Sequence, residues 1–237
     1  MNQKRIILVS SLLFFVSSYF MIRFQDVKVF SQISSLFIVI FALPSYYSLI
    51  RSMGTSKGAQ ILVILSILPV IVEGLAVRTG FPYGGFEYGD RLGWLLFDLV
   101  PPTISFAYLP MLLGSLKFAS KRSKELFTFC FVASIFNLMV DLVIDPAAVD
   151  IGFWLYSKQG FYFGVPLSNF IGWLITGFVY ALIFYQIAGR DSLPLADGVS
   201  ISLIWILSFW SGYLLQVDLF IPGLLGLAVL SLLLIEL

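Results

Sequence analysis

Long apolar stretches separated by short polar connections run through the whole chain. Most are long enough to cross the roughly 30 Å hydrocarbon core of a bilayer as an α-helix. The pattern predicts membrane-spanning helices over residues 6–22, 30–50, 59–77, 92–116, 126–144, 165–188, 199–217 and 219–235. The sequence therefore predicts an all-α, polytopic membrane helix bundle of about eight transmembrane helices.

The first stretch, which follows Lys4 and Arg5, imitates a signal peptide. It is long, however, and no small-residue cleavage site follows it, so we interpret it as the first helix of the bundle. No Gly/Ser-rich linker or repeat interrupts the chain, which predicts a single integral membrane domain over residues 1–237.

Composition supports the membrane interpretation. Hydrophobic residues make up 59% of the chain, charged residues only 11%, and the mean hydropathy is +0.99. An average soluble domain carries about a quarter charged residues, so membrane lipid is the expected surrounding of this chain. The formal net charge of +1 leaves no basic stripe, which argues against a nucleic-acid partner.

Histidine is absent, and this restricts the chemistry that the chain can perform. Membrane enzymes that activate oxygen use His-rich metal clusters, and haem proteins usually use an axial His. We therefore expect no metal site and no cofactor, and any acid or base must be Asp, Glu, Tyr, Lys or Cys. The single Cys130 lies in an apolar stretch and excludes an internal disulfide framework.

Basic residues in the connections predict the orientation of the helices. Nine of the fourteen fall on one side of the predicted bundle: Lys4, Arg5, Arg51, Lys57, Lys117, Lys121, Arg122, Lys124 and Arg190. The other side holds Arg23, Lys28, Arg78, Arg91 and Lys158. The positive-inside rule then predicts a cell-membrane protein with both termini in the cytoplasm and the long connections 78–91 and 145–164 on the outer face.

Four carboxylates lie inside or at the margins of apolar stretches: Glu73, Asp98, Asp141 and Asp145. The topology places all four toward the outer half of the membrane. A charge within a spanning helix costs roughly 2.5–3.5 kcal/mol on insertion scales, which predicts a shared polar cavity. Asn137, Asp141 and Asp145 follow at intervals of four and share one helix face. Two carboxylates so close in a site of low dielectric are expected to hold one proton between them.

Structural roles explain these acids as well. Each could cap a helix or form an ion pair with Arg78, Arg91 or Lys158, but three basic residues near the surface cannot easily neutralise four acids in an apolar layer. The aromatic loops 79–88 and 160–166 form either turns with interfacial anchors or a lid over a site. Pro101 and Pro102 are expected to kink the helix over 92–116 beside a cavity.

Several short motifs resemble those of the carotenoid-biosynthesis family of membrane proteins that contains carotenoid 1,2-hydratases and bisanhydrobacterioruberin hydratase. The resemblance covers about residues 70–175. The motifs are Glu73-Gly74, Thr79-Gly80-x-Pro82-Tyr83-Gly84, Asp141-x-x-x-Asp145-Pro146-x-Ala148, Gly152-x-Trp154 and Gly164-Val165-Pro166-x-x-Asn169-Phe170-x-Gly172-Trp173. Tyr156 stands where the resemblance leads us to expect a second Trp.

The resemblance implies a carotenoid hydratase that adds water across a terminal isoprenoid C=C bond of an acyclic carotenoid. Protonation by a neutral carboxylic acid gives a tertiary carbocation, which aromatic faces and a second carboxylate stabilise before water adds. We predict Asp141 and Asp145 as the acid/base pair, with Glu73 and Asp98 as second carboxylate or water-positioning groups. The predicted substrate-binding residues are Asn137, Asn169, Arg78, Tyr83, Tyr88, Trp154, Tyr162 and Trp173.

Other functions remain open at this stage. The spacing of Asn137, Asp141 and Asp145 resembles part of the first Asp-rich motif of UbiA-type prenyltransferases, which bind pyrophosphate through magnesium. The second motif would have to come from Asp191 and Asp197, which the topology places across the membrane. A proton-coupled transporter would also bury acids, although we find no inverted repeat. A protein that binds a carotenoid unchanged is a further alternative.

Overall fold

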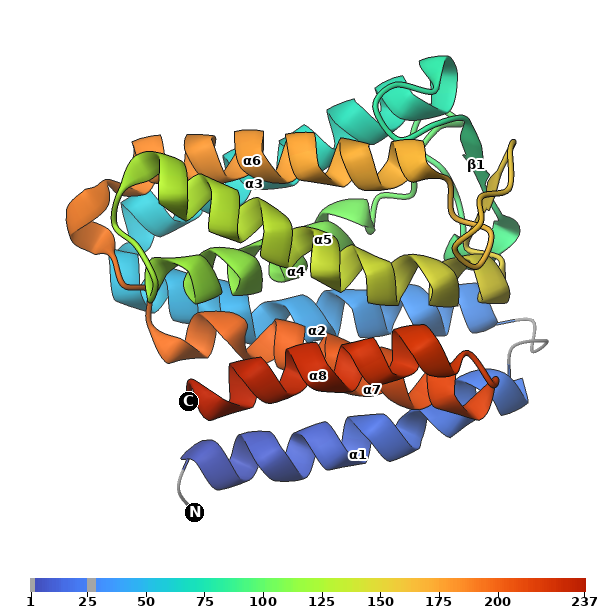
Figure 1. The fold of residues 1–237 in the computed structure, drawn as a ribbon, viewed down its shortest axis with the longest axis horizontal. Helices are drawn as coiled ribbons and strands as arrows, with labels where there is room; N and C mark the ends of the chain where they lie inside the picture. Colours follow the sequence, from blue (N-terminus) through green and yellow to red (C-terminus); the bar gives the residue numbers. More distant parts are fainter. Residues whose placement is uncertain (1–2, 25–28) are drawn as a thin grey trace.

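The structure, a computed structural model, describes residues 3–24 and 29–237; the predicted outer-face residue Lys28 lies outside them. Within these ranges eight α-helices and a two-stranded antiparallel sheet form the fold (Figure 1). The helices are α1 (Gln3–Phe24), α2 (Phe30–Met53), α3 (Thr55–Thr79), α4 (Ile104–Ser120), α5 (Leu126–Ile151), α6 (Leu167–Ala188), α7 (Ile201–Gln216) and α8 (Phe220–Ile235). The strands are β1 (Phe86–Tyr88) and β2 (Trp154–Tyr156), and three short 3₁₀ helices are η1 (Asp90–Leu92), η2 (Arg190–Ser192) and η3 (Asp197–Ser200).

The prediction of a helical membrane bundle is confirmed. By length and composition, six helical segments in the described part of the chain can cross a membrane. They are α1, α2, α3, α5, α6 and the continuous segment Asp197–Gln216, which consists of η3 and α7. The apolar helices α4 and α8 are shorter, with 17 and 16 residues. Every predicted stretch contains a helix, and the boundaries differ by a few residues except at α4 and α5.

The expected kinked helix over residues 92–116 is wrong. Residues 93–103 form a loop, and α4 begins only at Ile104, two residues after Pro102. Pro101 and Pro102 disfavour helical backbone at the residue before them and donate no N–H, so the helix starts after them instead of bending through them. Asp98 therefore lies in this loop, in left-handed backbone with φ of 56°, and is exposed.

Helix α5 extends beyond the predicted end at residue 144 and continues through Pro146 to Ile151. A proline inside a helix removes the hydrogen bond to the carbonyl four residues earlier, here that of Leu142. The Tyr162 hydroxyl donates to this carbonyl at 3.0 Å. The freed carbonyl is therefore satisfied, which is the condition for a proline inside an apolar helix.

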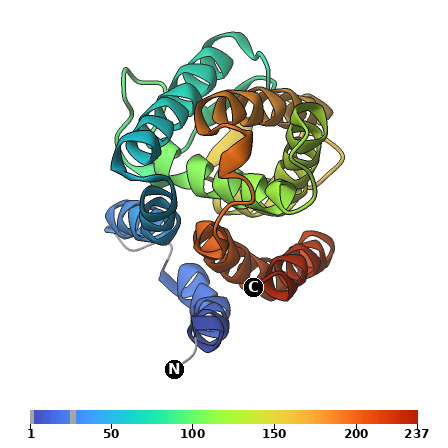
Figure 2. The same ribbon diagram turned by 90° about the vertical axis from the view of Figure 1, so that its left-hand side faces the viewer.

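The helices lie side by side, as Figure 1 shows, with α5 packed on α4 and α6, and α7 packed on α1 and α8. Seen along the bundle in Figure 2, α1 lies at the edge, against α7 and away from α3, α5 and α6. Helix α1 begins and α8 ends at one end of the bundle, and the β1–β2 sheet lies at the other (Figure 1). This arrangement positions the loops that follow α3 and α5 over the same end.

Candidate active site

The two long loops predicted for the outer face pair with each other. Strand β1 runs antiparallel to β2, with Phe86 opposite Tyr156 and Tyr88 opposite Trp154. Side chains alternate between the two faces of a strand, so these four rings share one face. They line a pocket inside the bundle, whereas Glu87 on the other face is exposed.

Three carboxylates from α3 and α5 meet beneath this aromatic face. Glu73, Asp141 and Asp145 are all buried. Tyr88 Oη donates to Glu73 Oε2 at 2.6 Å, and Tyr156 Oη donates to Asp145 Oδ2 at 2.8 Å. Each strand thus supplies a phenol that orients one carboxylate, which fixes the acids relative to the loops.

Asn169, in the first turn of α6, connects the two aspartates. Its Nδ2 donates to Asp141 Oδ2 at 3.0 Å and to Asp145 Oδ2 at 2.5 Å. The other oxygen of Asp141, Oδ1, is buried and has no hydrogen-bond partner within the described residues. Two fully charged carboxylates this close repel strongly in an apolar interior, so the arrangement favours one proton shared by the pair.

A small cavity, which we call the carboxylate pocket, has a volume of about 60 Å³. Its lining residues are Glu73, Tyr83, Phe86, Tyr88, Ile104, Ala107, Tyr108, Met111, Ile144, Asp145, Trp154, Tyr156, Asn169 and Trp173. Among the described residues no Lys or Arg lines it. Acids on two walls and aromatic rings around them make a pocket suited to a proton donor and a transient cation.

The phenols at the pocket are hydrogen-bond donors over the physiological pH range. Burial raises the pKa of Tyr88 and of Tyr156 well above the usual range, and the negative charges of Glu73 and Asp145, respectively, add to the effect. Both hydroxyls therefore stay protonated, and each stabilises the ionised form of the carboxylate that it contacts.

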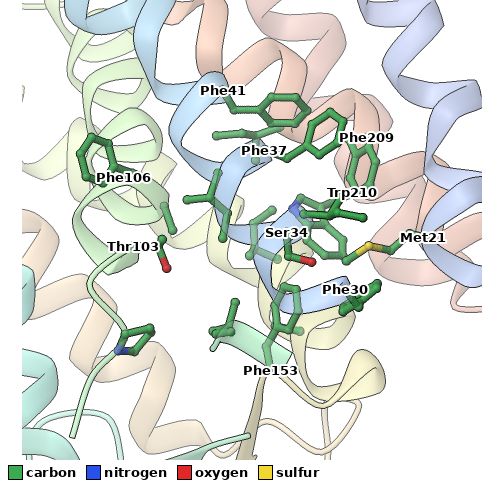
Figure 3. A pocket seen from close by; sticks show the side chains of 18 of the residues that line it. Met21, Phe30, Ser34, Phe37, Phe41, Thr103, Phe106, Phe153, Phe209 and Trp210 are labelled. Carbon is green, nitrogen blue, oxygen red and sulfur yellow. The ribbon is translucent and has the colours of Figure 1, made fainter. Parts of the chain in front are cut away.

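A larger hollow, which we call the aromatic cavity, lies next to the carboxylate pocket and has a volume of about 380 Å³ (Figure 3). Rings from several helices line it, among them Phe30, Phe41, Phe106, Phe209 and Trp210. The two hollows share five lining residues, which are Ile104, Ala107, Met111, Ile144 and Trp154. The carboxylates thus lie beside a space that suits an apolar molecule.

Two predicted site residues lie away from the carboxylate pocket. Asp98 is exposed in the loop before α4 and lines neither hollow, so its expected place in the acid cluster is corrected. Arg78 is exposed near the end of α3 and also lines neither. The prolines that delay the start of α4, and the surface end of α3, account for these positions.

Asn137 and Tyr162 do not line the carboxylate pocket, and their polar groups have other partners. Asn137 Nδ2 donates to Tyr108 Oη at 3.3 Å and its Oδ1 accepts from Ser115 at 3.4 Å. Asn137 thus orients a ring of the pocket wall instead of lining the pocket itself. Tyr162 donates to the Leu142 carbonyl and lines neither hollow.

The structural position of Tyr162 gives a first prediction. Tyr162→Phe leaves the Leu142 carbonyl without its partner, so we expect a loss of about 1 kcal/mol in the free energy of unfolding, with little change in activity. Thermal unfolding in detergent, compared with a turnover assay, measures both. A large loss of activity at unchanged stability would instead support the substrate contact predicted from the sequence.

Three aromatic residues of the pocket were not predicted as site residues: Tyr156, Tyr108 and Phe86. The alternation Phe86-x-Tyr88 and Trp154-x-Tyr156 is a period-two pattern typical of short strands, and it was the available signal for two of them. Tyr108 lies in an apolar helix, where an aromatic residue looks like any core residue. Its ring centroid lies 5.1 Å from that of Trp173, a contact between α4 and α6.

The second acidic pair of the prenyltransferase alternative lies at the far end of the bundle. Asp191 and Asp197 belong to η2 and η3, opposite the sheet (Figure 1). Asp197 forms ion pairs with Lys117 at 3.4 Å and Lys121 at 2.9 Å. It therefore cannot act together with Asp141 and Asp145. In the described ranges, no group of three or more His, Cys, Asp or Glu is arranged to hold a metal ion.

Comparisons with known proteins agree with the motifs. The bisanhydrobacterioruberin hydratase of Haloarcula japonica is 40% identical over 168 residues, which is 63% of this chain and 55% of that protein. This chain therefore spans about half the length of that relative. No solved structure matches. The model of the family described as "Carotenoid biosynthesis protein" matches residues 30–233, so the chain belongs to the carotenoid biosynthesis protein family.

Proposed function

We propose that this protein is a carotenoid hydratase, which adds water across a terminal C=C bond of an acyclic carotenoid. The buried carboxylates beneath a wall of aromatic rings carry the proposal, because this chemistry needs an acid in a dry pocket and faces that stabilise a cation. The hydratase name of the Haloarcula japonica relative supports the same reaction.

The reaction begins with proton transfer. Asp145 lines the carboxylate pocket, whereas Asp141 lies behind it without lining it. Asp145 thus delivers the proton that the pair shares to the less substituted carbon of the terminal double bond. A new C–H bond forms, the π bond breaks, and the neighbouring carbon becomes a tertiary carbocation, the more stable of the two possible cations.

The cation forms between Glu73 and the rings of Trp154 and Trp173, all of which line the pocket. In its ionised form Glu73, which accepts a hydrogen bond from Tyr88, lowers the energy of this cation. Water then adds to the cation through its oxygen. The proton that this water loses returns to the aspartate pair and restores the acid, so the cycle consumes one water and needs no redox step.

Proton transfer and water addition balance without a metal or a redox cofactor, and we infer a cofactor-independent enzyme. We also infer that both termini are cytoplasmic in the cell membrane and that the carboxylate pocket lies in its outer half, because the basic residues concentrate at the end of the bundle away from the sheet.

Expression in cells that accumulate an acyclic carotenoid tests the proposal. We expect a pigment one water heavier than the precursor, detected by mass spectrometry of extracts, and incorporation of ¹⁸O from labelled water. Cells that express the Asp145→Asn variant are the matched control. A product enlarged by an isoprenoid unit would support a prenyltransferase. Proton flux without any product would support a transporter, and pigment that is bound but unchanged would support a binding protein. Each of these results would contradict hydration.

A further inference from the structure

The aromatic cavity is distinct from the carboxylate pocket, but the two adjoin each other. Five residues line both it and the carboxylate pocket. Trp154, one of the five, also packs edge-on against Tyr88, with ring centroids 6.2 Å apart. Tyr88 in turn holds Glu73. The shared side chains therefore form the wall between a molecule in the aromatic cavity and the acids, and that molecule reaches the acids if these side chains move aside.

The aromatic cavity opens at the edge of the bundle. Phe20 and Phe24 of α1 and Phe37 of α2 line it, although they are 59%, 51% and 48% exposed. Side chains that both line a hollow and face outward mark its mouth. Helix α1 packs chiefly on α7, and Figure 2 shows it at the edge of the bundle. The mouth therefore lies between α1 and α2, where the surroundings are lipid.

The lining selects the kind of molecule that fits. It contains no charged residue, and its polar groups are the hydroxyls of Ser17, Ser34 and Thr103 and the indole N–H groups of two tryptophans, among many rings and aliphatic groups. Burying a charged group there would cost several kcal/mol, because no charged side chain of the lining compensates it. An extended conjugated hydrocarbon loses nothing on entry and gains contact with the ring faces.

We propose that the hydrocarbon chain of the polyene substrate enters sideways from the bilayer between α1 and α2 and lies in the aromatic cavity, with its end at Asp145 and Glu73. This inference rests on the proposed function, since it assigns the place of that substrate. The substrate never passes through water, and the cavity sets the orientation in which its terminal double bond meets the acid.

Filling the cavity tests the inference. Ser34 is buried and lies on the cavity wall (Figure 3), so Ser34→Trp inserts an indole where the polyene would lie. We expect kcat/KM, measured against the mole fraction of polyene in lipid vesicles, to fall at least tenfold, mainly through KM. Leu36→Trp is the matched control, because Leu36 is on the same helix, exposed, and lines neither hollow. It should change kcat/KM less than twofold.

A binding measurement separates this inference from the proposed reaction. In the Asp145→Asn background, where turnover is blocked, the absorption shift of bound polyene gives its affinity. We expect Ser34→Trp to weaken binding at least tenfold there. If Ser34→Trp does not fold, Met21→Trp on the α1 side of the mouth replaces it, with the same expectation.

The outcomes are distinct. If Ser34→Trp weakens polyene binding but the wild-type protein never hydrates a polyene, the result would support polyene binding in the aromatic cavity and refute the hydration reaction. Hydration and binding at wild-type level in the correctly folded Trp variants would refute the cavity and leave the reaction intact. The second result is also the one expected if the cavity holds the acyl chain of a membrane lipid.

Discussion

Asp145→Asn is expected to lower the rate of hydration by about a thousandfold while the protein still inserts into the membrane. The amide has nearly the shape of the acid and can keep a contact with Tyr156, but it has no proton acidic enough to transfer to an alkene. General acids typically contribute about 10²- to 10⁴-fold to a rate. Turnover of polyene per mole of purified protein in vesicles measures the effect.

Asp191→Asn is the matched control for this variant, because Asp191 is exposed in η2 at the opposite end of the bundle. Its rate should equal that of the wild type. Thermal unfolding of both variants distinguishes a chemical defect from a folding defect. Full activity in a folded Asp145→Asn protein would remove Asp145 from the mechanism and leave Glu73 as the carboxyl group that lines the pocket.

Glu73→Gln is expected to lower kcat by about a hundredfold and to change KM little. The substitution removes a negative charge that stabilises the cation, which exists only after proton transfer, so ground-state binding is largely unaffected. Loss of one preorganised electrostatic group in a dry site typically costs this much. Steady-state kinetics over a range of polyene concentrations in vesicles separates the two constants.

Glu87→Gln is the control for this second variant, because Glu87 lies on the exposed face of β1, one residue from Tyr88. It should keep the wild-type kcat. A Glu73→Gln protein with raised KM and unchanged kcat would indicate that Glu73 binds the substrate and does not act on the transition state.

Much of the fold follows from local pattern. The apolar stretches identify all eight α-helices of the described residues, because a chain in lipid must satisfy its backbone polar groups within each segment and the helix does so. Proline produced the main errors. At Pro101 and Pro102 the helix starts later than predicted, whereas at Pro146 the helix continues, because Tyr162 satisfies the freed carbonyl of Leu142. The two cases differ in whether a hydrogen-bond donor from outside the helix satisfies the carbonyl that the proline leaves free, and the local sequence does not show this.

The sequence by itself determined that Asp141 and Asp145 share a helix face at one end of a membrane bundle, because spacing by four residues sets a face and loop charge sets an end. Tertiary structure alone decided that Glu73 joins them, that Asp98 does not, and that Tyr156 and Asn169 orient Asp145. It also formed the aromatic cavity. These features depend on contacts between segments far apart in the chain, and periodicity within one segment carries no information about its neighbours.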